Sequence, residues 1–455
     1  MHARYSGVDN HGVSDIPRRT ASRTAKLAGI PLGVAGRAAA GFGRRLTGGD
    51  RDEISAQLAA RSAEQLFAVL GELKGGAMKF GQALSVFEAA VPDEYAEPYR
   101  EALTRLQTAA PPMPMADVDF MLTQQFGRSW TSRFAEFDET PAASASIGQV
   151  HRATWKRDGR EVAVKVQYPG AAEALRSDLR QLGRMSRILQ PLAPGMEIKP
   201  LVEELRSRME EELDYRDEAA YQREFAAMYE GAPDVKIPRV VGSAPRAVIT
   251  EWVEGRPLAS IIGEGTPEER DQAGNQLARF HYAAPDRAHL LHADPHPGNF
   301  GILDDGRLLV LDFGAVARMP DGMPPELVAM TKYALEGRDG DLMALMRSAG
   351  FVHDGASIEP EQVLGYLAPF TEPLGTEEFH FSRHWLQAQA ERVGDLRSPD
   401  AAIGRSLNLP ARFLLVHRVT MGTVGILCQL DARVRLREIV AEWQPEMFRP
   451  DVPTG

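Results

Sequence analysis

Hydrophobic positions follow two different periods along this chain. Over residues 52–106 apolar side chains recur three and four positions apart, which predicts helix. In the stretch REVAVKVQYPG, Val162, Val164 and Val166 alternate with other residues, which predicts a strand that carries Lys165 on its opposite face. The first patterned part of the chain is therefore helical, and a sheet follows it.

A second strand, a connector and a hairpin complete the pattern. RAVITEW predicts another strand, and VEGRPLA after it predicts an extended connector. A charge-dense helix is predicted from about residue 200 to residue 229. From about residue 267 helical spacing dominates, apart from the hairpin FGILDDGRLLVLDFG with its DDGR turn. A small β-rich lobe before a large helical lobe indicates an α+β, two-lobed, protein-kinase-like fold.

The changes of pattern divide the chain into five predicted segments. The Pro-rich AAPPMPM marks one of the boundaries. The last segment carries no motif that can be interpreted beyond helical packing. The segments are a basic flexible arm, a helical extension, an N-terminal lobe, the core of the C-terminal lobe and a C-terminal helical region, over residues 1–50, 51–110, 115–255, 256–345 and 346–455.

Composition and charge narrow the class of protein. The chain has 455 residues, of which 44% are hydrophobic and 25% charged, as in soluble globular proteins. Its net charge of −11 argues against general nucleic-acid binding. Residues 1–50 hold eight basic and three acidic residues, a net +5 that leaves −16 for the rest. This arm could contact an anionic membrane surface, and a solvated tail is the plainer alternative.

Cysteine content and hydropathy bear on the compartment. The single cysteine, Cys428, excludes a disulfide framework and a cysteine-rich zinc site, as expected in a reducing cytosol. The basic arm lacks the apolar core of a secretory signal. The most apolar run, residues 413–430, is interrupted by His417 and Arg418, which favours a buried or surface-lying helix over a transmembrane span. A cytoplasmic protein is expected, and peripheral membrane association is open.

Three polar side chains surround the predicted hairpin. Asp294 and Asn299 have the D-x-x-x-x-N spacing of a kinase catalytic loop, and Asp312 begins D-F-G at the end of the hairpin. Phosphoryl transfer from ATP needs a positioned acceptor and Mg²⁺ with hard oxygen ligands. We therefore expect Asp294 to orient or deprotonate the acceptor, and Asn299 and Asp312 to hold the metal. An acidic surface hairpin is the alternative, and it does not explain the order of the motifs.

Two histidines flank this loop. His292 and His296 are zinc ligands by type, but no third ligand has a suitable spacing. A packed loop histidine is preferred for His292, and His296 is left open.

The nucleotide should also contact the first lobe. Lys165 lies in VAVK, where kinase folds hold the α- and β-phosphates, and the acidic stretch EEELDYRDEAAYQREF offers it several partners, most of which should form a solvated helix face. The segment AASASIGQV precedes this strand, and alanine there replaces the first two glycines of the usual nucleotide loop. The nucleotide-binding candidates are Lys165 itself and Ala143, Ala145, Ser146, Gly148, Val150, Glu251 and Val253.

These motifs together resemble the AarF/UbiB (ADCK) family of atypical kinase-like proteins over roughly residues 60–345. LKGGAMKFGQALS has no counterpart in ordinary kinases and carries the K-x-G-Q motif of the family. The resemblance implies that Lys165 pairs with Glu218 as part of the catalytic site. It also implies regulatory contacts in which Lys79 and Gln82, on a helical extension, interact with an E-x-D pair, Glu212 and Asp214.

The family resemblance implies ATP and Mg²⁺ as cofactors, ATP hydrolysis, restrained protein-kinase activity, and support of isoprenoid-lipid or quinone metabolism with lipid-pathway enzymes as partners. The sequence agrees with the restraint, since no A-P-E motif follows D-F-G and helix resumes within about ten residues. Two alternatives stay open: a small-molecule phosphotransferase of the aminoglycoside or choline kinase type, and a nucleotide-sensing pseudokinase scaffold.

Overall fold

In a computed structural model of the chain, the structure describes residues 112–145, 147–173, 176, 213–353, 355–394 and 398–449. The helix predicted over 52–106 lies outside these residues. Four of the predicted site residues lie outside them as well, namely Lys79, Gln82, Ser146 and Glu212.

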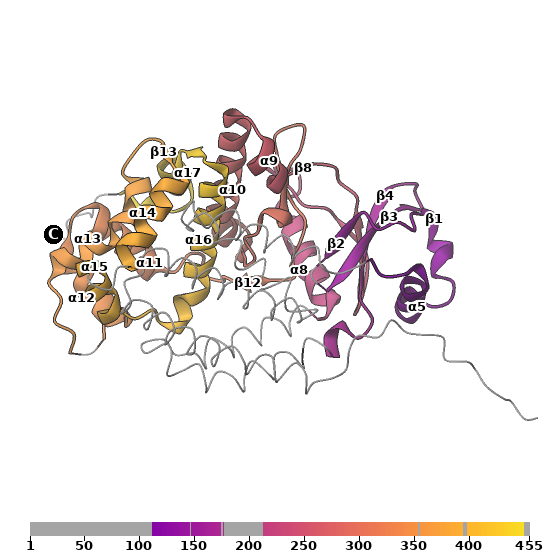
Figure 1. Cartoon of the computed structure of the whole chain (residues 1–455), viewed down its shortest axis with the longest axis horizontal. Helices are drawn as coiled ribbons and strands as arrows, with labels where there is room; N and C mark the ends of the chain where they lie inside the picture. The colour runs from indigo at the N-terminus through magenta and orange to yellow at the C-terminus, as the bar shows by residue number, and fades with distance from the viewer. Residues whose placement is uncertain are drawn as a thin grey trace, which may run out of the picture. The chain divides into compact units, whose positions relative to one another are not determined.

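An antiparallel sheet forms the first lobe. Its order is β1-β3-β4-β7-β6, with β2 paired to β3. Figure 1 shows β1, β2, β3 and β4 of this sheet in purple. The predicted VAVK and RAVITEW strands are confirmed as β4 and β7, which pair with each other. The strands are β1 (Phe134–Phe137), β2 (Ala143–Ala145), β3 (Gly148–Trp155), β4 (Glu161–Gln167), β6 (Val240–Ala244) and β7 (Ala247–Glu251).

Each face of this sheet meets a helix. Helix α5 (Met115–Phe126) and the 3-10 turn η2 (Trp130–Arg133) share a hydrophobic cluster with Val162, Val164 and Val166 of β4. Because side chains alternate along a strand, Lys165 is turned to the other side. There α8 (Tyr215–Met228) packs, with Tyr215 and Ala219 against Val248. The sheet thus places Lys165 beside α8.

The second lobe is built around a long helix and short strand pairs. The hairpin predicted in FGILDDGRLLVLDFG is confirmed, with its two strands paired antiparallel and Gly306 at a φ of 87° in the turn. One sheet has the order β5-β11-β10-β8, and β12 pairs with β9. The elements are β5 (Val235–Lys236), β8 (Arg256–Pro257), α9 (Leu258–Glu264), α10 (Pro267–Ala288), β9 (Leu290–His292), η4 (Pro297–Asn299), β10 (Phe300–Ile302), β11 (Leu308–Val310) and β12 (Val316–Arg318).

The predicted connector is shorter than expected. Of VEGRPLA, only residues 253–255 lack regular structure, since Arg256 and Pro257 form β8 against β10 and α9 begins at Leu258. Pro257 precedes the helix with an extended backbone, and Leu258 is fully buried, so hydrophobic burial draws this end of the connector into the second lobe.

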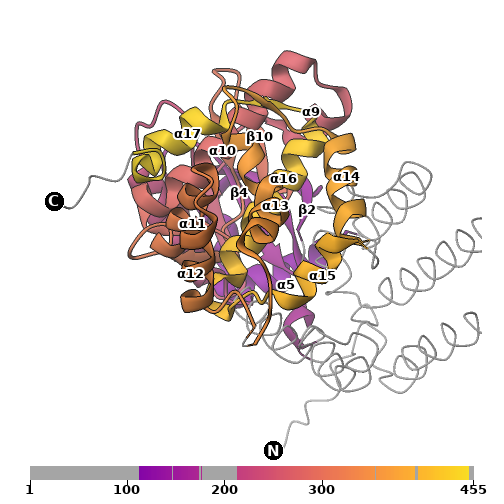
Figure 2. The same ribbon diagram turned by 90° about the vertical axis from the view of Figure 1, so that its left-hand side faces the viewer.

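Helices make up most of the C-terminal region, as predicted. Figure 2 shows many of them gathered together in orange and yellow, and neighbouring helices contact one another. The elements are α11 (Pro325–Leu335), α12 (Asp339–Ala349), α13 (Pro360–Thr371), η5 (Glu372–Leu374), β13 (Phe379–His380), α14 (Arg383–Gly394), α15 (Pro399–Ser406), α16 (Ala411–Leu430), β14 (Arg433–Val434), α17 (Leu436–Trp443) and η6 (Pro445–Met447).

Helix α16 contains the apolar run noted in the sequence. Within the described ranges it is the one helix long and apolar enough to cross a membrane by length and composition, and 61% of its most apolar window is buried inside the structure. It packs on α10, and its residues Val416 and Val419 join a cluster with Leu291 and Ala293. The expected buried helix is therefore observed, in an α+β fold with a sheet lobe and a helix-rich C-terminal lobe.

Candidate active site

Lys165 joins the two lobes through carboxylates. Its Nζ lies 2.7 Å from Oε1 and 3.0 Å from Oε2 of Glu218 on α8, and 3.0 Å from Oδ2 of Asp312 in the second lobe. Glu218 is buried and Lys165 nearly so. The Asp214 side chain caps α8 by accepting a hydrogen bond from the Arg216 amide, which begins the helix one turn before Glu218. The expected Lys165–Glu218 pair is thus present.

The surroundings of Lys165 keep it charged. Burial by itself lowers its pKa, but Asp312, Glu218 and Tyr215 raise it, and together they hold the pKa well above its ordinary value. The Tyr215 ring lies 5.0 Å from the ammonium, a cation–π contact for which no sequence motif was a signal. A charged ammonium is suited to holding phosphate oxygens.

Asn299 is oriented by Asp294. The Asn299 amide Nδ2 donates to the Asp294 carbonyl over 3.0 Å and to its Oδ2 over 3.1 Å. With the amide nitrogen used in this way, the Asn299 Oδ1 points in another direction and can act as a ligand. The Asn299 carbonyl also accepts from the Leu311 amide, which lies beside Asp312. The catalytic-loop pair is therefore tied directly to the D-F-G segment.

Asp312 makes three polar contacts, two through its carboxylate and one through its carbonyl. Its Oδ1 accepts from the Gly314 amide at 2.8 Å, its Oδ2 contacts Lys165, and its carbonyl accepts from Nε2 of His292 at 2.6 Å. His292 is buried among Phe280, Phe300 and Phe313, as a packed loop histidine would be. This geometry fixes Asp312 relative to both lobes.

A transition-metal site does not fit these side chains. His296 accepts a hydrogen bond from the Gly298 amide and caps η4. Among the residues that the structure describes, no group of three His, Cys, Asp or Glu side chains could hold a metal ion. Asp312 and Asn299 instead offer hard oxygen donors, which suit a cation that takes its other ligands from phosphate and water.

The alanine-rich loop forms a strand. Ala143 and Ala145 lie in β2 and pair with Val150 and Gly148 of β3. Ser146, which follows β2, lies outside the described residues. A Cβ on Gly148 would come within 2.2 Å of the Val166 carbonyl oxygen on β4. Glycine at 148 is therefore required by the close approach of the strand that carries Lys165. The β2–β3 hairpin replaces a loop that would bend around phosphates through glycines.

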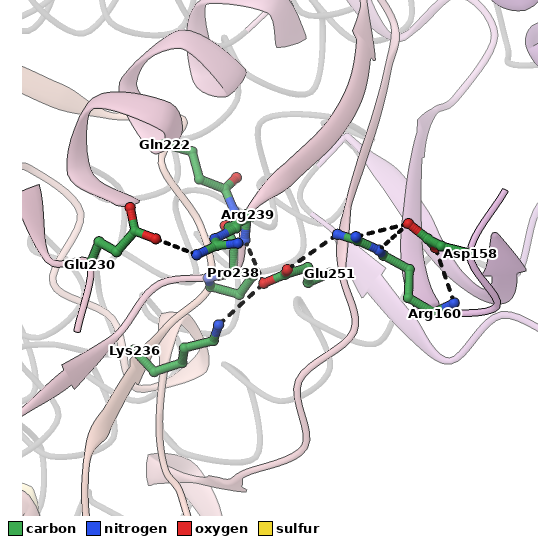
Figure 3. A network of polar contacts seen from close by, with 8 residues as sticks. All are labelled: Asp158, Arg160, Gln222, Glu230, Lys236, Pro238, Arg239 and Glu251. Carbon is green, nitrogen blue, oxygen red and sulfur yellow. Dashed lines mark hydrogen bonds and ion pairs between the residues drawn. The ribbon is translucent and has the colours of Figure 1, made fainter. Parts of the chain in front are cut away.

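Glu251 has a structural use that the sequence did not reveal. Its carboxylate accepts from Nζ of Lys236 at 3.2 Å, from the Arg239 amide at 3.1 Å and from Arg160 at 3.5 Å (Figure 3). Burial alone would raise the pKa of this carboxyl. Hydrogen bonds from the Arg239 amide and Lys236 lower it by more, so the pKa lies below its ordinary value. The nucleotide contacts expected for Glu251 and Val253 stay predictions.

Comparison with known proteins decides the family. Residues 105–345 match the model of the ABC1 atypical kinase-like domain, more than half of the chain. The chain belongs to this family. The AarF/UbiB assignment made from the motifs is thereby confirmed, and the protein is an atypical kinase-like protein.

Relatives of this ABC1-family chain cover most of its length. "Atypical kinase coq-8, mitochondrial" of Caenorhabditis elegans is 30% identical over 92% of the chain, and "Atypical kinase COQ8, mitochondrial" of Schizosaccharomyces pombe is 29% identical over 87%. The chain spans 57% and 65% of these two relatives. A solved structure of Rv3197 from Mycobacterium tuberculosis, described as a complex with erythromycin, is 49% identical, covers 88% of this chain and all of its own, and has a TM-score of 0.68.

Some expectations from the ABC1 family concern residues outside the described ranges. Lys79 and Gln82 of the K-x-G-Q motif, and Glu212 of the E-x-D pair, are among them. Asp214 is described, and it caps α8 and pairs with Arg216 at 2.5 Å. Its regulatory role stays a prediction, as does the cytoplasmic location expected from the sequence.

Proposed function

We propose that this ABC1-family protein binds ATP with Mg²⁺ and hydrolyses it, in support of isoprenoid-lipid or quinone metabolism. The observation that carries the proposal is the position of Lys165, within 3.0 Å of both Glu218 and Asp312. This arrangement unites the phosphate-binding lysine, the helix that orients it and the first residue of D-F-G, which phosphoryl transfer requires together.

Some of these side chains would bind the nucleotide and metal, and Asp294 would act on the acceptor. Asn299 Oδ1 and Asp312 would hold Mg²⁺, which when bound neutralises charge on the phosphate oxygens. Lys165 would hold the α- and β-phosphates while Glu218 keeps it in place. Asp294 would orient the acceptor or take its proton, and its Oδ2 also fixes Asn299. The β2–β3 hairpin, with Ala143, Ala145, Gly148 and Val150, would cover the nucleotide.

The acceptor is proposed to be water rather than a peptide. After Gly314, the chain pairs at once with β9 through β12, and α11 begins at Pro325. Between Gly314 and α11, only Ala315 and residues 319–324 lie outside a helix or strand, which is little for binding an extended peptide. This favours hydrolysis over protein phosphorylation.

Replacement of Asp312 tests the proposal directly. We expect Asp312→Asn to lose the Mg²⁺-dependent part of ATP affinity and to lower hydrolysis by about 10²–10³-fold, because one charge-stabilising group is removed. Titration calorimetry with and without Mg²⁺, and a phosphate-release assay, measure the two effects. Asp305→Asn is the matched control, since Asp305 lies exposed in the turn of the same hairpin and pairs with Arg307. Undiminished Mg-ATP binding by Asp312→Asn would refute the metal assignment.

The same phosphate-release assay separates the alternatives. Release that requires a small added alcohol would favour a small-molecule phosphotransferase. No release by the parent protein, even with anionic liposomes and a phenolic quinone-precursor mimic, would favour a nucleotide-sensing scaffold. Faster release with the liposomes would favour contact of the protein with an anionic membrane surface over a solvated basic arm.

A further inference from the structure

Helix α16 reaches the catalytic loop from a part of the chain beyond the family match. The match ends at residue 345, and α16 begins at Ala411. Nevertheless Nη2 of Arg418 donates to the Ala293 carbonyl at 2.9 Å, directly before Asp294. Val416 and Val419 pack in one cluster with Leu291 of β9, Ala293 of the loop and Ala315 after D-F-G.

A second contact is made on the other side of Asp294. Gly422 faces Pro295, and a Cβ at position 422 would lie 2.4 Å from Cγ and 3.3 Å from Cβ of that proline. A proline ring cannot rotate away as a flexible side chain can. Gly422 therefore lets the loop approach the helix, and any larger residue would displace Pro295.

These two contacts hold the residues directly before and after Asp294. Ala293 is held at its carbonyl by Arg418 and at its amide by the Ala315 carbonyl, 2.9 Å away. Pro295 is held by van der Waals contact with α16. Asp294 in turn orients Asn299 through its Oδ2. A shift of the loop would move the proposed acceptor-orienting group and a proposed metal ligand together.

The geometry points to Arg418 and Gly422 as positioning residues for the catalytic loop. This inference rests on the proposed function, because it assigns them to the ATP hydrolysis that Asp294 would support. Arg418 acts through the Ala293 carbonyl, and Gly422 through the Pro295 ring. The C-terminal helices thus contribute to turnover rather than only to the hydrophobic core.

The chain supplies a matched control for each residue. Arg412 lies on the same helix, and its Nη2 also donates to a backbone carbonyl. That carbonyl belongs to Ala349 at the end of α12, which is far in sequence from the catalytic loop. Gly365 lies within α13, with nothing within 4 Å of an added Cβ. Because alanine favours helix over glycine, Gly→Ala replacements should not weaken either helix.

Kinetics of the full chain test the inference. We expect Arg418→Ala to lower kcat about 10-fold and Gly422→Ala by up to about 10²-fold, since small misplacement of a catalytic group is costly. Affinity for ATP without Mg²⁺ should change little, because the side-chain contacts of Lys165 are with Glu218 and Asp312 rather than with α16. Mg-ATP affinity should fall only as far as Asn299 moves with the loop, and less than kcat does. Arg418→Lys should recover part of the rate. Arg412→Ala and Gly365→Ala should keep the rate of the parent.

Hydrogen exchange separates this inference from the proposed function. The Ala293, Asn299 and Leu311 amides report on the loop, since each donates to a backbone carbonyl. Faster exchange of these amides in both α16 variants would uphold the positioning role. If the parent protein at the same time hydrolyses no ATP, the proposed ATPase function is rejected while the positioning role stands. An active parent with unchanged kcat and unchanged exchange in both variants would overturn the positioning role. Equal losses in the control variants would overturn it too, because the effect would be general destabilisation.

Discussion

Two charged centres lie on adjacent strands of the same sheet, and they differ in burial. Lys165 on β4 has 14% of its side chain exposed, and its partner Glu218 has 5%. Glu251 at the end of β7 has 20% exposed, and its partners Lys236 and Arg160 have 29% and 44%. Each centre joins segments far apart in sequence. The Lys165–Glu218 pair is the more buried, and Asp312, the second partner of Lys165, has 29% of its side chain exposed.

This difference decides what each centre can do. Charges removed from water are costly unless they are paired, so the Lys165 centre must keep its partners in place or bind a ligand that substitutes for them. Its partners also belong to the elements proposed for catalysis. The Glu251 centre includes a backbone amide and hydrated cations, whose loss water can compensate. The first centre is suited to binding, and the second to holding β7 beside the segment that leads from β5 to β6.

The largest effect is expected from the buried centre. Lys165→Met should lower phosphate release by about 10²–10³-fold, because a charge-stabilising group is lost. It should also lower the free energy of unfolding by about 3–5 kcal/mol, since Glu218 would be left buried beside a neutral side chain. Urea denaturation and the phosphate-release assay measure these two losses.

Lys236→Met is the control for the exposed centre. It removes the same charge from a strand residue paired with a single glutamate. We expect a loss of about 1 kcal/mol or less in the free energy of unfolding and little change in turnover. Equal losses from the two lysine variants would remove the distinction between the centres.

A smaller effect, dependent on pH, is expected from Glu251→Gln. The pKa of Glu251 is lowered in the folded protein, so its stabilisation is present above its ordinary value of 4.5 and is lost as the pH falls through the folded value. We expect Glu251→Gln to cost about 1–2 kcal/mol at about pH 7, since it removes hydrogen bonds to a charged acceptor. The cost should shrink as the pH falls below 4.5 and through the folded value, as urea denaturation at neutral and acidic pH can show.

Lys165 should respond to pH in the opposite direction. Its pKa is raised in the folded protein, so its stabilisation is complete below its ordinary value of 10.5 and is lost only as the pH rises through the folded value. Titration of Lys165 should therefore change the difference in the free energy of unfolding between the parent and Lys165→Met very little between neutral pH and about pH 9. A loss of that difference near neutral pH would contradict the assigned charge.

The sequence predicted the parts of the site that have a fixed motif order. Lys165, Asp294, Asn299 and Asp312 were found because strand, loop, hairpin and D-F-G follow one another as phosphate chemistry requires. Glu218 could not be chosen from spacing, since the acidic stretch offered several partners, and the family resemblance selected it. Its burial beside Lys165 depends on how α8 packs on the sheet, which is a tertiary property.

Other parts of the structure left little signal in the sequence. Arg418 was visible only as an interruption of an apolar run, and its contact with Ala293 spans 125 positions. Gly422 gave no signal either, because a glycine within a helix does not reveal what lies against it. Glu251 was predicted to bind nucleotide, and its cations, Arg160 and Lys236, come from two segments far from it in sequence. Such contacts are set by the fold, so sequence patterns of short range cannot predict them.

The smallest effect should come from an exposed pair that also touches α8. Arg318 on β12 donates to both carboxylate oxygens of Glu224, over 3.1 and 2.9 Å, and most of the Arg318 side chain is exposed. We expect a double-mutant cycle with Arg318→Ala and Glu224→Ala to give a coupling of about 0.5 kcal/mol, since solvent screens such pairs. The coupling should fall further in high salt. A coupling as large as the effect of Lys165→Met would mean that α8 is held as firmly by this exposed pair as by Lys165, and burial would no longer separate the two kinds of centre.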